Sequence, residues 1–336
     1  MSIKSFIKTL HEGGSLDEAQ SEELFDAVFA GLVSEIELAG ALVALRMRRE
    51  TASELLGAVR SMRKCARPVL LEGNGYFDTC GTGGDNSHSF NISTATAIVL
   101  SAMNRPVVKH GNRSMSSRSG SADFLEALGV PVSLSDEEAA RCFARTGFVF
   151  LYAPEYHPAM RYAAPVRKAL GVRTIFNYCG PLANPASPSR QMIGVFHPDA
   201  LQLYSEVVAR LPYERVVVYS ARSGMDEVSP FEPTFVYEIS GSRSGMFSID
   251  PREYLSPSEA KDLPHGLSAA DYALLFEETV ENDEPTALGK LIALNTALAL
   301  YTLDGGDMHE HFTQALECVH DGRTQAQLER LREALL

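Results

Sequence analysis

The pattern of apolar residues changes near Arg67 and Pro68, and this change limits the folds that the chain can adopt. Before it, apolar side chains recur at helical spacing, as in Leu24 and Val28. From Tyr76 onward, short apolar segments typical of strands alternate with helical segments, which is the signature of an α/β domain. A chain of 336 residues is long enough for a large domain and a small one. We therefore expect a small N-terminal helical domain followed by a larger α/β domain.

Four short helices are predicted within the first 65 residues. Three of them begin at a capping box, in which a Ser or Thr is followed three residues later by Glu. The boxes pair Ser15 with Glu18, Ser34 with Glu37, and Thr51 with Glu54. A bundle of this size usually buries its remaining apolar face against another domain or subunit, so we expect oligomerisation through it.

Strands are predicted in the second part of the chain at residues 76–80, 106–108, 148–151, 192–196 and 215–219. Several of these strands end directly in loops that carry glycine, serine or charged residues. Ligands of open α/β sheets bind beyond the carboxyl ends of the strands. These loops are therefore the expected place of a binding site.

The first such loop belongs to the segment DTCGTGGDNSHSFNIST, residues 78–94, which leads into a predicted helix. Glycines let backbone amides approach an anion closely, and a helix N-terminus offers free N–H groups. We interpret the segment as a phosphate cradle, although a plain tight turn fits an isolated glycine-rich loop as well. It is not a Walker A loop, because no Lys-Ser/Thr follows, and Asn86 replaces a glycine of the dinucleotide fingerprint.

The second loop, in KHGNRSMSSRSGSADFLEALG (residues 109–129), combines Lys109, Arg113 and Arg118 with several serines. Ammonium, guanidinium and hydroxyl groups are strong donors to an anion. The alternative is a solvated serine-rich loop. The surrounding charge pattern favours the anion site.

Two windows, residues 86–122 and 156–198, contain none of the 43 Asp and Glu residues of the chain. They contain nine basic residues: Arg105, Lys109, Arg113, Arg118, Arg161, Arg167, Lys168, Arg173 and Arg190. Charges of one sign gathered in a cleft attract the opposite charge, so a small polyanionic substrate is expected. Burial alone would deplete arginine as well as acids.

Two further motifs carry chemistry. SGMDEVSP, residues 223–230, offers the adjacent carboxylates of Asp226 and Glu227, which suit Mg²⁺ bound together with substrate phosphates, although such pairs are common on surfaces. HPAMRYAAPVRKALGVRTIFNYCGPLANP, residues 157–185, predicts a basic helix that ends near Gly171 and a later Gly180-Pro181 turn. The alternative for this segment is a surface helix with a structural histidine.

The overall composition narrows the class of protein. A net charge of −13 argues against general nucleic-acid binding, which depends on basic surface. The longest apolar segments are too short to span a bilayer, and the N-terminus lacks the apolar core of a signal peptide, so a cytoplasmic protein without a membrane partner is expected. Five scattered cysteines suggest reduced thiols.

Together, GTGGD with FNIST, KHGNR with SSRSGSAD, the HPAM-to-GPLANP segment and GMDEVS resemble the anthranilate phosphoribosyltransferase family in order and spacing. The resemblance implies a nucleoside phosphorylase/phosphoribosyltransferase-like α/β fold with a central, mainly parallel sheet. Its helical domain would comprise residues 1–66 with 157–185, and its α/β domain residues 67–156 with 186–336. It also implies a homodimer through the helical domain, an active site between the domains, and a role in tryptophan biosynthesis. The reaction would move phosphoribose from phosphoribosyl pyrophosphate (PRPP) to the amino group of anthranilate.

The same resemblance implies the site residues. PRPP would be held by Gly81, Thr82, Gly84, Asp85, Asn91, Ser93, Thr94 and Lys109. Two Mg²⁺ ions per monomer would be bound by Ser93, Asp226 and Glu227. Anthranilate would contact His110, Asn112, His157, Arg167 and Pro181, with Arg167 facing its carboxylate. The sequence departs from the family pattern at Asn86, where glycine is common, and at Tyr178-Cys179, where aliphatic residues are usual.

The expected chemistry needs no strong general base, because an aromatic amine is already unprotonated at neutral pH. Mg²⁺ and basic donors would stabilise the departing pyrophosphate while the protein orients the amine. A pyrimidine nucleoside phosphorylase is an alternative that KHGNR and the Asp-Glu pair disfavour. A non-catalytic, nucleic-acid-binding relative is a second alternative, which the acidic net charge disfavours.

Overall fold

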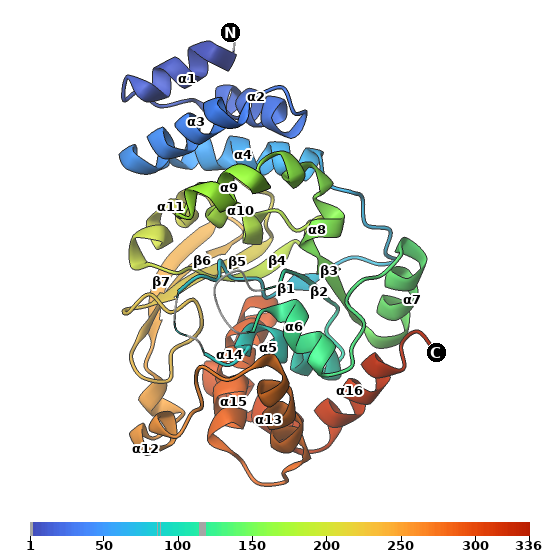
Figure 1. Cartoon of the computed structure of the whole chain (residues 1–336). Coiled ribbons are helices and arrows are strands. Elements are labelled where there is room, and N and C mark those ends of the chain that lie inside the picture. Colours follow the sequence, from blue (N-terminus) through green and yellow to red (C-terminus); the bar gives the residue numbers. More distant parts are fainter. Residues whose placement is uncertain (1–2, 86, 88, 114–118) are drawn as a thin grey trace. The chain divides into compact units, whose positions relative to one another are not determined.

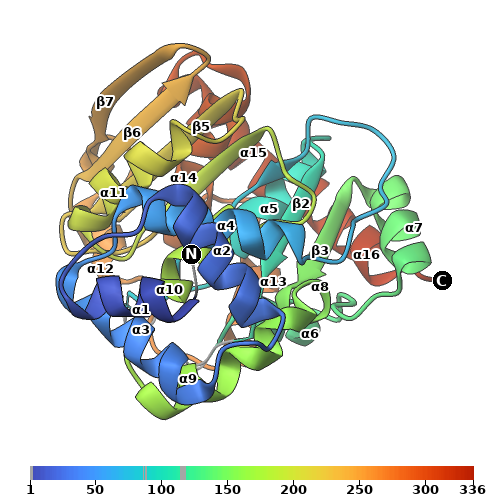
Figure 2. The same ribbon diagram turned by 90° about the horizontal axis from the view of Figure 1, so that it is seen from above.

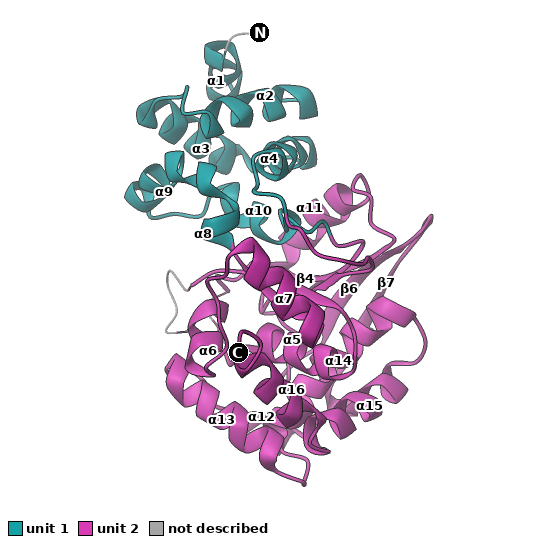
Figure 3. Ribbon diagram, turned by 90° about the vertical axis from the view of Figure 1, so that its right-hand side faces the viewer, with its two compact units in different colours: residues 1–68, 153–187 teal, residues 69–152, 188–336 magenta. Residues whose placement is uncertain are grey.

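A computed structural model (Figure 1) describes residues 3–85, 87, 89–113 and 119–336. It separates the chain into two compact units, coloured in Figure 3. Unit 1 comprises residues 1–68 and 153–187, and unit 2 comprises residues 69–152 and 188–336. Unit 1 is therefore built from two segments that are distant in sequence. Asn86 and Arg118, both singled out above, lie outside the described residues.

Unit 1 is helical. Its helices are α1 (Ile3–His11), α2 (Glu18–Phe29), α3 (Glu35–Arg48), α4 (Ala52–Lys64), α8 (Ala153–Tyr156), the 3₁₀ helix η1 (Pro158–Tyr162), α9 (Ala164–Leu170) and α10 (Phe176–Leu182). The capping boxes predicted at Ser34 and Thr51 are confirmed. The box predicted at Ser15 is wrong, because Asp17 caps α2 and pairs with Gln20 instead. The Ser15 hydroxyl accepts a hydrogen bond from Arg48.

Close helix contact and aromatic packing hold unit 1 together. A Cβ atom at Gly57 of α4 would lie 2.6 Å from the backbone of α2, so glycine lets these two helices touch. The ring of Phe176 in α10 lies 5.6 Å from that of Phe25 and 6.1 Å from that of Phe29, measured between centroids. The second segment of unit 1 thus completes a core that the first segment begins.

Unit 2 contains a seven-stranded sheet in the order β3-β2-β1-β4-β5-β6-β7. The strands are β1 (Phe77–Asp78), β2 (Val107–Gly111), β3 (Phe148–Tyr152), β4 (Arg190–Gly194), β5 (Arg215–Ala221), β6 (Thr234–Ser240) and β7 (Arg243–Ile249). Neighbours from β3 to β5 pair in parallel, whereas β6 and β7 are antiparallel and form the edge seen in Figure 2. The predicted mainly parallel sheet is confirmed, and β6 and β7 were not predicted.

Helices cover both faces of this sheet. They are α5 (Ile92–Ala102), α6 (Ser121–Ala127), α7 (Asp136–Thr146), α11 (Pro198–Val208), η2 (Pro251–Glu253), α12 (Pro257–Lys261), α13 (Ala269–Glu281), α14 (Ala287–Asp304), α15 (Met308–His320) and α16 (Arg323–Arg332). Figure 1 shows α11 on one face and α5 and α14 on the other.

Alternation along β5 follows these two faces. Val217, Tyr219 and Ala221 join the core beneath α5 and α14, while the residues between them face the α11 side. Nearly every residue of α14 is buried, which is typical of a central helix that is apolar all round. Within the described ranges, no helix is long and apolar enough to cross a membrane.

Candidate active site

The phosphate loop, residues 79–91, leads from β1 to the N-terminus of α5. Gly83 and Gly84 have φ values of 64° and 73°, a left-handed conformation that favours glycine. Asn91 occupies the N-cap of α5 without a side-chain capping hydrogen bond, and its side chain instead bonds Ser119. Among the first amides of α5, those of Ile92 and Thr94 donate to the backbone carbonyls of Phe90 and Asn91, which leaves the Ser93 amide for an acceptor from another part of the chain or for an anionic ligand.

Asp226 and Glu227 supply such acceptors from the loop after β5. The backbone N–H of Gly83 donates to Asp226 Oδ2 at 2.6 Å, and the N–H of Ser93 donates to Glu227 Oε1 at 3.3 Å. Asp85 Oδ2 accepts a long bond, 3.4 Å, from the Asp226 backbone. Two predicted PRPP-site residues, Asp85 and Ser93, and the predicted carboxylate pair are thus brought together within unit 2.

Two glycines permit this close approach. A Cβ atom at Gly81 would lie 2.8 Å from Asp226 Oδ2, and one at Gly194 would lie 1.7 Å from the Asp226 carbonyl oxygen. The Thr82 N–H donates to the Gly194 carbonyl, and the Thr82 hydroxyl accepts from Phe196 N. Backbone atoms are therefore in contact among three segments: the end of β4, the phosphate loop, and the loop after β5 that carries Asp226 and Glu227.

The carboxylate pair is buried and electrostatically unbalanced. Burial, and next the charge of Asp85, raise the pKa of Asp226 to about 8. Burial and the neighbouring Asp226 raise the pKa of Glu227 well above its ordinary value. Glu227 Oε2 is buried and has no hydrogen-bond partner among the described residues. Buried carboxylate oxygens without hydrogen-bond partners are ligands that a hard divalent cation binds well.

Mg²⁺ fits this donor set. It is usually held by one or two carboxylates together with substrate phosphates and water, so a larger protein cluster is not required. Consistently, the described part of the chain has no group of three His, Cys, Asp or Glu side chains with metal-site geometry. Asp226, Glu227 and the nearby Ser93 hydroxyl are the residues available to such an ion.

Lys109 on β2 brings a buried cation to the same place. It is 2% exposed, and its Nζ donates to Thr79 Oγ1 at 3.1 Å and to Ser93 Oγ at 3.2 Å. The Thr79 hydroxyl in turn donates to the Ser93 carbonyl. Thr79 was not predicted, because a threonine at the end of a strand carries no signal of its own. The Lys109 charge opposes the rise in the pKa of Glu227.

Several other bases of the acid-free windows pair with acids from outside those windows. Arg105 pairs with Asp304, Arg113 with Asp123 and Glu126, and Arg190 with Glu214. The interpretation of Arg113 as an anion donor is therefore wrong for this structure, since two carboxylates already engage its guanidinium. Absence of acids along a sequence segment did not predict absence of acids around it in space.

The remaining predicted residues of unit 2 differ in exposure. Thr94 is buried, and its Oγ1 has no hydrogen-bond partner among the residues that the structure describes. His110 is 2% exposed at the end of β2, while Asn112 just beyond it is exposed. Gly84 is exposed within the phosphate loop.

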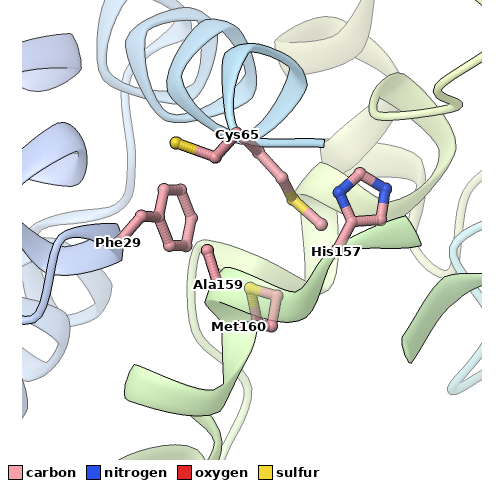
Figure 4. Close-up of a pocket in the computed structure, with 6 residues that line it drawn as sticks. Phe29, Cys65, His157, Ala159 and Met160 are labelled. Carbon is pink, nitrogen blue, oxygen red and sulfur yellow. The ribbon is translucent and has the colours of Figure 1, made fainter. Parts of the chain in front are cut away.

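Unit 1 holds His157, Arg167 and Pro181. His157 is 3% exposed, and burial lowers its pKa to about 4, so the imidazole is neutral at physiological pH. Figure 4 shows it beside a small pocket that is lined mainly by apolar side chains and thiol sulfur: Phe29, Met62, Cys65, Ala159 and Met160.

Arg167 on α9 is half-buried, and its guanidinium lies 5.5 Å from the ring centroid of Phe176. Burial lowers its pKa, and no carboxylate of the described residues forms an ion pair with it. The predicted turn at Gly180-Pro181 is wrong, because both residues lie within α10. A proline near the end of so short a helix removes only one backbone hydrogen bond.

Comparison with known proteins gives consistent matches along the chain. The helical bundle domain of the glycosyl transferase family matches residues 4–66, and the a/b domain of that family matches residues 73–325. An anthranilate phosphoribosyltransferase of Idiomarina loihiensis is 38% identical over 330 residues, covering 98% of this chain and 97% of that protein. An anthranilate phosphoribosyltransferase of Metallosphaera sedula is 40% identical over 324 residues, covering 94% of this chain and 93% of that protein.

Solved structures agree with these relatives. Anthranilate phosphoribosyltransferase from Thermus thermophilus superposes with a TM-score of 0.89 at 36% identity, over 98% of each chain. The enzyme from Saccharomyces cerevisiae, in complex with PRPP and Mg, also gives a TM-score of 0.89, at 25% identity, over 99% of this chain and 97% of that one.

Proposed function

Because the chain belongs to the anthranilate phosphoribosyltransferase family, we propose that the residues gathered at the carboxyl ends of β1, β2 and β5 form its site for PRPP and Mg²⁺. The chain is a glycosyltransferase of tryptophan biosynthesis. It moves the phosphoribosyl group of PRPP to the amino group of anthranilate, which gives N-(5-phosphoribosyl)anthranilate and pyrophosphate. It uses Mg²⁺, as the S. cerevisiae complex indicates.

One observation carries the placement of the site. The phosphate loop, the N-terminus of α5, Lys109 and the Asp226–Glu227 pair converge although they are far apart in sequence. A helix N-terminus and a lysine ammonium favour phosphate oxygens, and the carboxylates favour Mg²⁺. PRPP with Mg²⁺ bound to its phosphates is a ligand that presents phosphate and metal together.

In this proposal the pyrophosphate of PRPP lies against the phosphate loop, at Gly81, Thr82, Gly84 and Asp85, and near Asn91, Ser93 and Thr94 of α5. Mg²⁺, held by Asp226, Glu227 and Ser93, supplies positive charge to the pyrophosphate leaving group. Lys109 adds a fixed cation close to Ser93. Two ions per monomer are proposed, since two carboxylates and a hydroxyl can serve two ions that share phosphate oxygens.

The reaction itself requires charge stabilisation and orientation. The C1–N bond forms as the bond between C1 and the pyrophosphate oxygen breaks, and the amine loses a proton. Because an arylamine is unprotonated at neutral pH, no side chain has to remove a proton before attack. In this proposal Lys109 and the positive end of α5 are fixed, before the reaction, beside the charge that develops on the leaving group, and such preorganised groups usually make the largest contribution to catalysis.

Anthranilate is proposed to contact His110, Asn112, His157, Arg167 and Pro181. Arg167 is the best candidate for its carboxylate, because the guanidinium is partly desolvated and has no ion-pair partner among the described residues. A neutral His157, with its pKa near 4, would contact the substrate without adding charge.

The test is anthranilate-dependent release of pyrophosphate from PRPP. Wild-type protein should require Mg²⁺, and Glu227→Gln should lose about 100-fold or more in kcat, the cost of removing one electrostatic group from such a site. Arg113→Lys is the matched control, since Arg113 already pairs with two acids. Full turnover in EDTA, or a Glu227→Gln variant as active as wild type, would contradict the metal assignment.

We also propose a homodimer through unit 1. Ile36, Val43 and Met47 lie on one face of α3 and are 87%, 42% and 81% exposed. Exposed apolar stripes of this kind usually mark interfaces. Light scattering should give a dimer at micromolar concentration, which Met47→Glu weakens, whereas Leu274→Glu on the exposed surface of unit 2 should leave it intact. A monomeric wild-type protein would contradict the proposal.

A further inference from the structure

The last residue of β1, Asp78, is completely buried beside the proposed site and accepts hydrogen bonds from two of its segments. Asp78 Oδ1 accepts from the backbone N–H of Cys80 at 3.0 Å and from the backbone N–H of His110 at 3.3 Å. Cys80 is the second residue of the phosphate loop, whereas His110 follows Lys109 on β2. One carboxylate oxygen therefore joins the phosphate-binding segment to the segment that carries the buried lysine.

The sheet explains why a side chain is needed at this point. β1 has two residues, and its ladder with β2 is recorded only at Phe77 with Val107. β2 continues to Gly111, paired with β3 on its other side. No further β1–β2 pair follows within the described residues, and the His110 N–H donates to the Asp78 carboxylate on that side. The Asp78 carboxylate takes the place of a strand partner.

We propose that Asp78 is a positioning residue, which fixes the phosphate loop and the Lys109–His110 segment relative to each other so that both meet PRPP in register. This inference rests on the proposed function of the site. Thr79, the next residue, accepts a hydrogen bond from Lys109 Nζ, so a shift of the Asp78 contacts would move the lysine ammonium as well. Displacements of about 1 Å can cost about 100-fold in rate.

A second layer holds the carboxylate itself in place. Gln191 Nε2 donates to Asp78 Oδ2 at 3.3 Å, and the hydroxyl of Tyr213 donates to Gln191 Oε1 at 2.8 Å. An asparagine at position 78 could keep this arrangement. Its oxygen would accept from both backbone groups, and the Gln191 amide would turn over, since a tyrosine hydroxyl can accept as well as donate.

Three variants separate positioning from stability. Asp78→Ser leaves a short hydroxyl that can still accept from the Cys80 N–H in a serine turn but cannot reach His110 N. Asp78→Asn retains both backbone contacts. Thr146→Val removes another buried side-chain acceptor of unit 2, the partner of Phe148 N, and serves as the stability control.

The measurements are steady-state kinetics and amide hydrogen exchange of the metal-free protein. We expect Asp78→Ser to raise the KM for PRPP and lower kcat by about tenfold or more each, with faster exchange at His110 but not at Cys80. Asp78→Asn should stay within about threefold of wild type, since its hydrogen bonds are kept. Thr146→Val should lower the melting temperature and leave both KM values unchanged.

Hydrogen exchange distinguishes failure of this inference from failure of the proposed function, because it needs no activity. If Asp78→Ser exchanges at His110 as slowly as wild type, or lowers the melting temperature without changing KM, Asp78 is structural and the inference is overturned. If Asp78→Asn is as impaired as Asp78→Ser, charge and not hydrogen bonding is responsible, which also overturns it. Wild-type protein without anthranilate-dependent pyrophosphate release would refute the proposed function alone.

Discussion

Asp226→Asn should make the metal-free protein more stable at pH 8 while removing its Mg²⁺-dependent activity. Burial raises the pKa of Asp226 from an ordinary value of 3.8 to about 8. In the unfolded chain this carboxyl loses its proton near pH 4, whereas the folded protein retains it. Its contribution to the free energy of unfolding is therefore complete below pH 4 and is lost as pH rises toward 8. An amide does not titrate and escapes this loss.

The magnitude follows from the shift. Each pKa unit corresponds to about 1.4 kcal/mol, so a shift of about four units sets an upper limit of about 6 kcal/mol. The charges of Asp226 and Glu227 act on each other, so part of the penalty passes to Glu227 when the Asp226 carboxyl is removed. The Gly83 N–H can still donate to an asparagine oxygen. We expect a gain of about 1–4 kcal/mol at pH 8 and almost none at pH 4.

Urea denaturation in EDTA, from pH 4 to pH 8.5, measures this difference. Asp250→Asn is the control of opposite sign, because hydrogen bonds and charge from Arg252 lower the pKa of Asp250 to about 2, so its removal should destabilise above pH 4. Mg²⁺ with PRPP should stabilise the wild type and not Asp226→Asn. If Asp226→Asn is no more stable than wild type at pH 8 in EDTA, the carboxylate is not strained by burial and the argument for a cation site weakens.

Further predictions concern unit 1. Arg167→Ala should raise the KM for anthranilate about 30-fold or more and leave the KM for PRPP unchanged. Arg167→Lys should restore part of the loss, and Lys168→Ala, the control, should change neither KM. A raised KM for PRPP in Arg167→Ala would instead assign Arg167 to the phosphate site. Gly57→Ala should destabilise the protein by about 1–3 kcal/mol in thermal unfolding, because its Cβ would meet backbone of α2 at 2.6 Å, and an unchanged melting temperature would show that α2 and α4 can separate freely. Arg49 has φ 70° and ψ 128°, a conformation that strains a residue with a side chain. Arg49→Gly should therefore raise the free energy of unfolding by about 0.5–1 kcal/mol. A lower free energy of unfolding would show that the backbone at Arg49 is not strained.

Local patterns in the sequence predicted local structure well. The capping boxes at Ser34 and Thr51, and the glycine-rich segment between β1 and α5, depend on residues close in sequence, and the structure has them. The box at Ser15 failed because Asp17, two residues later, is an equally good cap and Arg48 engages the serine. Local rules do not decide between two adjacent caps when a distant side chain selects one.

The antiparallel edge escaped prediction for a different reason. β6 and β7 lie at the border of the sheet, and β7 is largely exposed, so its sequence RSGMFSI has neither a buried apolar run nor a clean alternation. The contact of Asp226 with Gly83 was also beyond local reading, since the two residues are 143 positions apart. The resemblance of the motifs to the family placed Asp226 and the glycine loop in one site. The close approach of the Asp226 backbone to Gly194 could not be predicted from the sequence.

The discontinuous construction of unit 1 affects how the protein is made on the ribosome. Phe25 and Phe29 leave the exit tunnel early, but Phe176, which covers them, is synthesised only after the intervening part of unit 2. Phe29 and Phe176 are about 150 residues apart, so at about 5–20 residues per second the interval between them lasts about 7–30 s. During it the first helices expose an apolar surface that a chaperone can recognise. The nascent chain is thus most prone to aggregation in the middle of translation, and slow codons between β1 and β3 would lengthen that period.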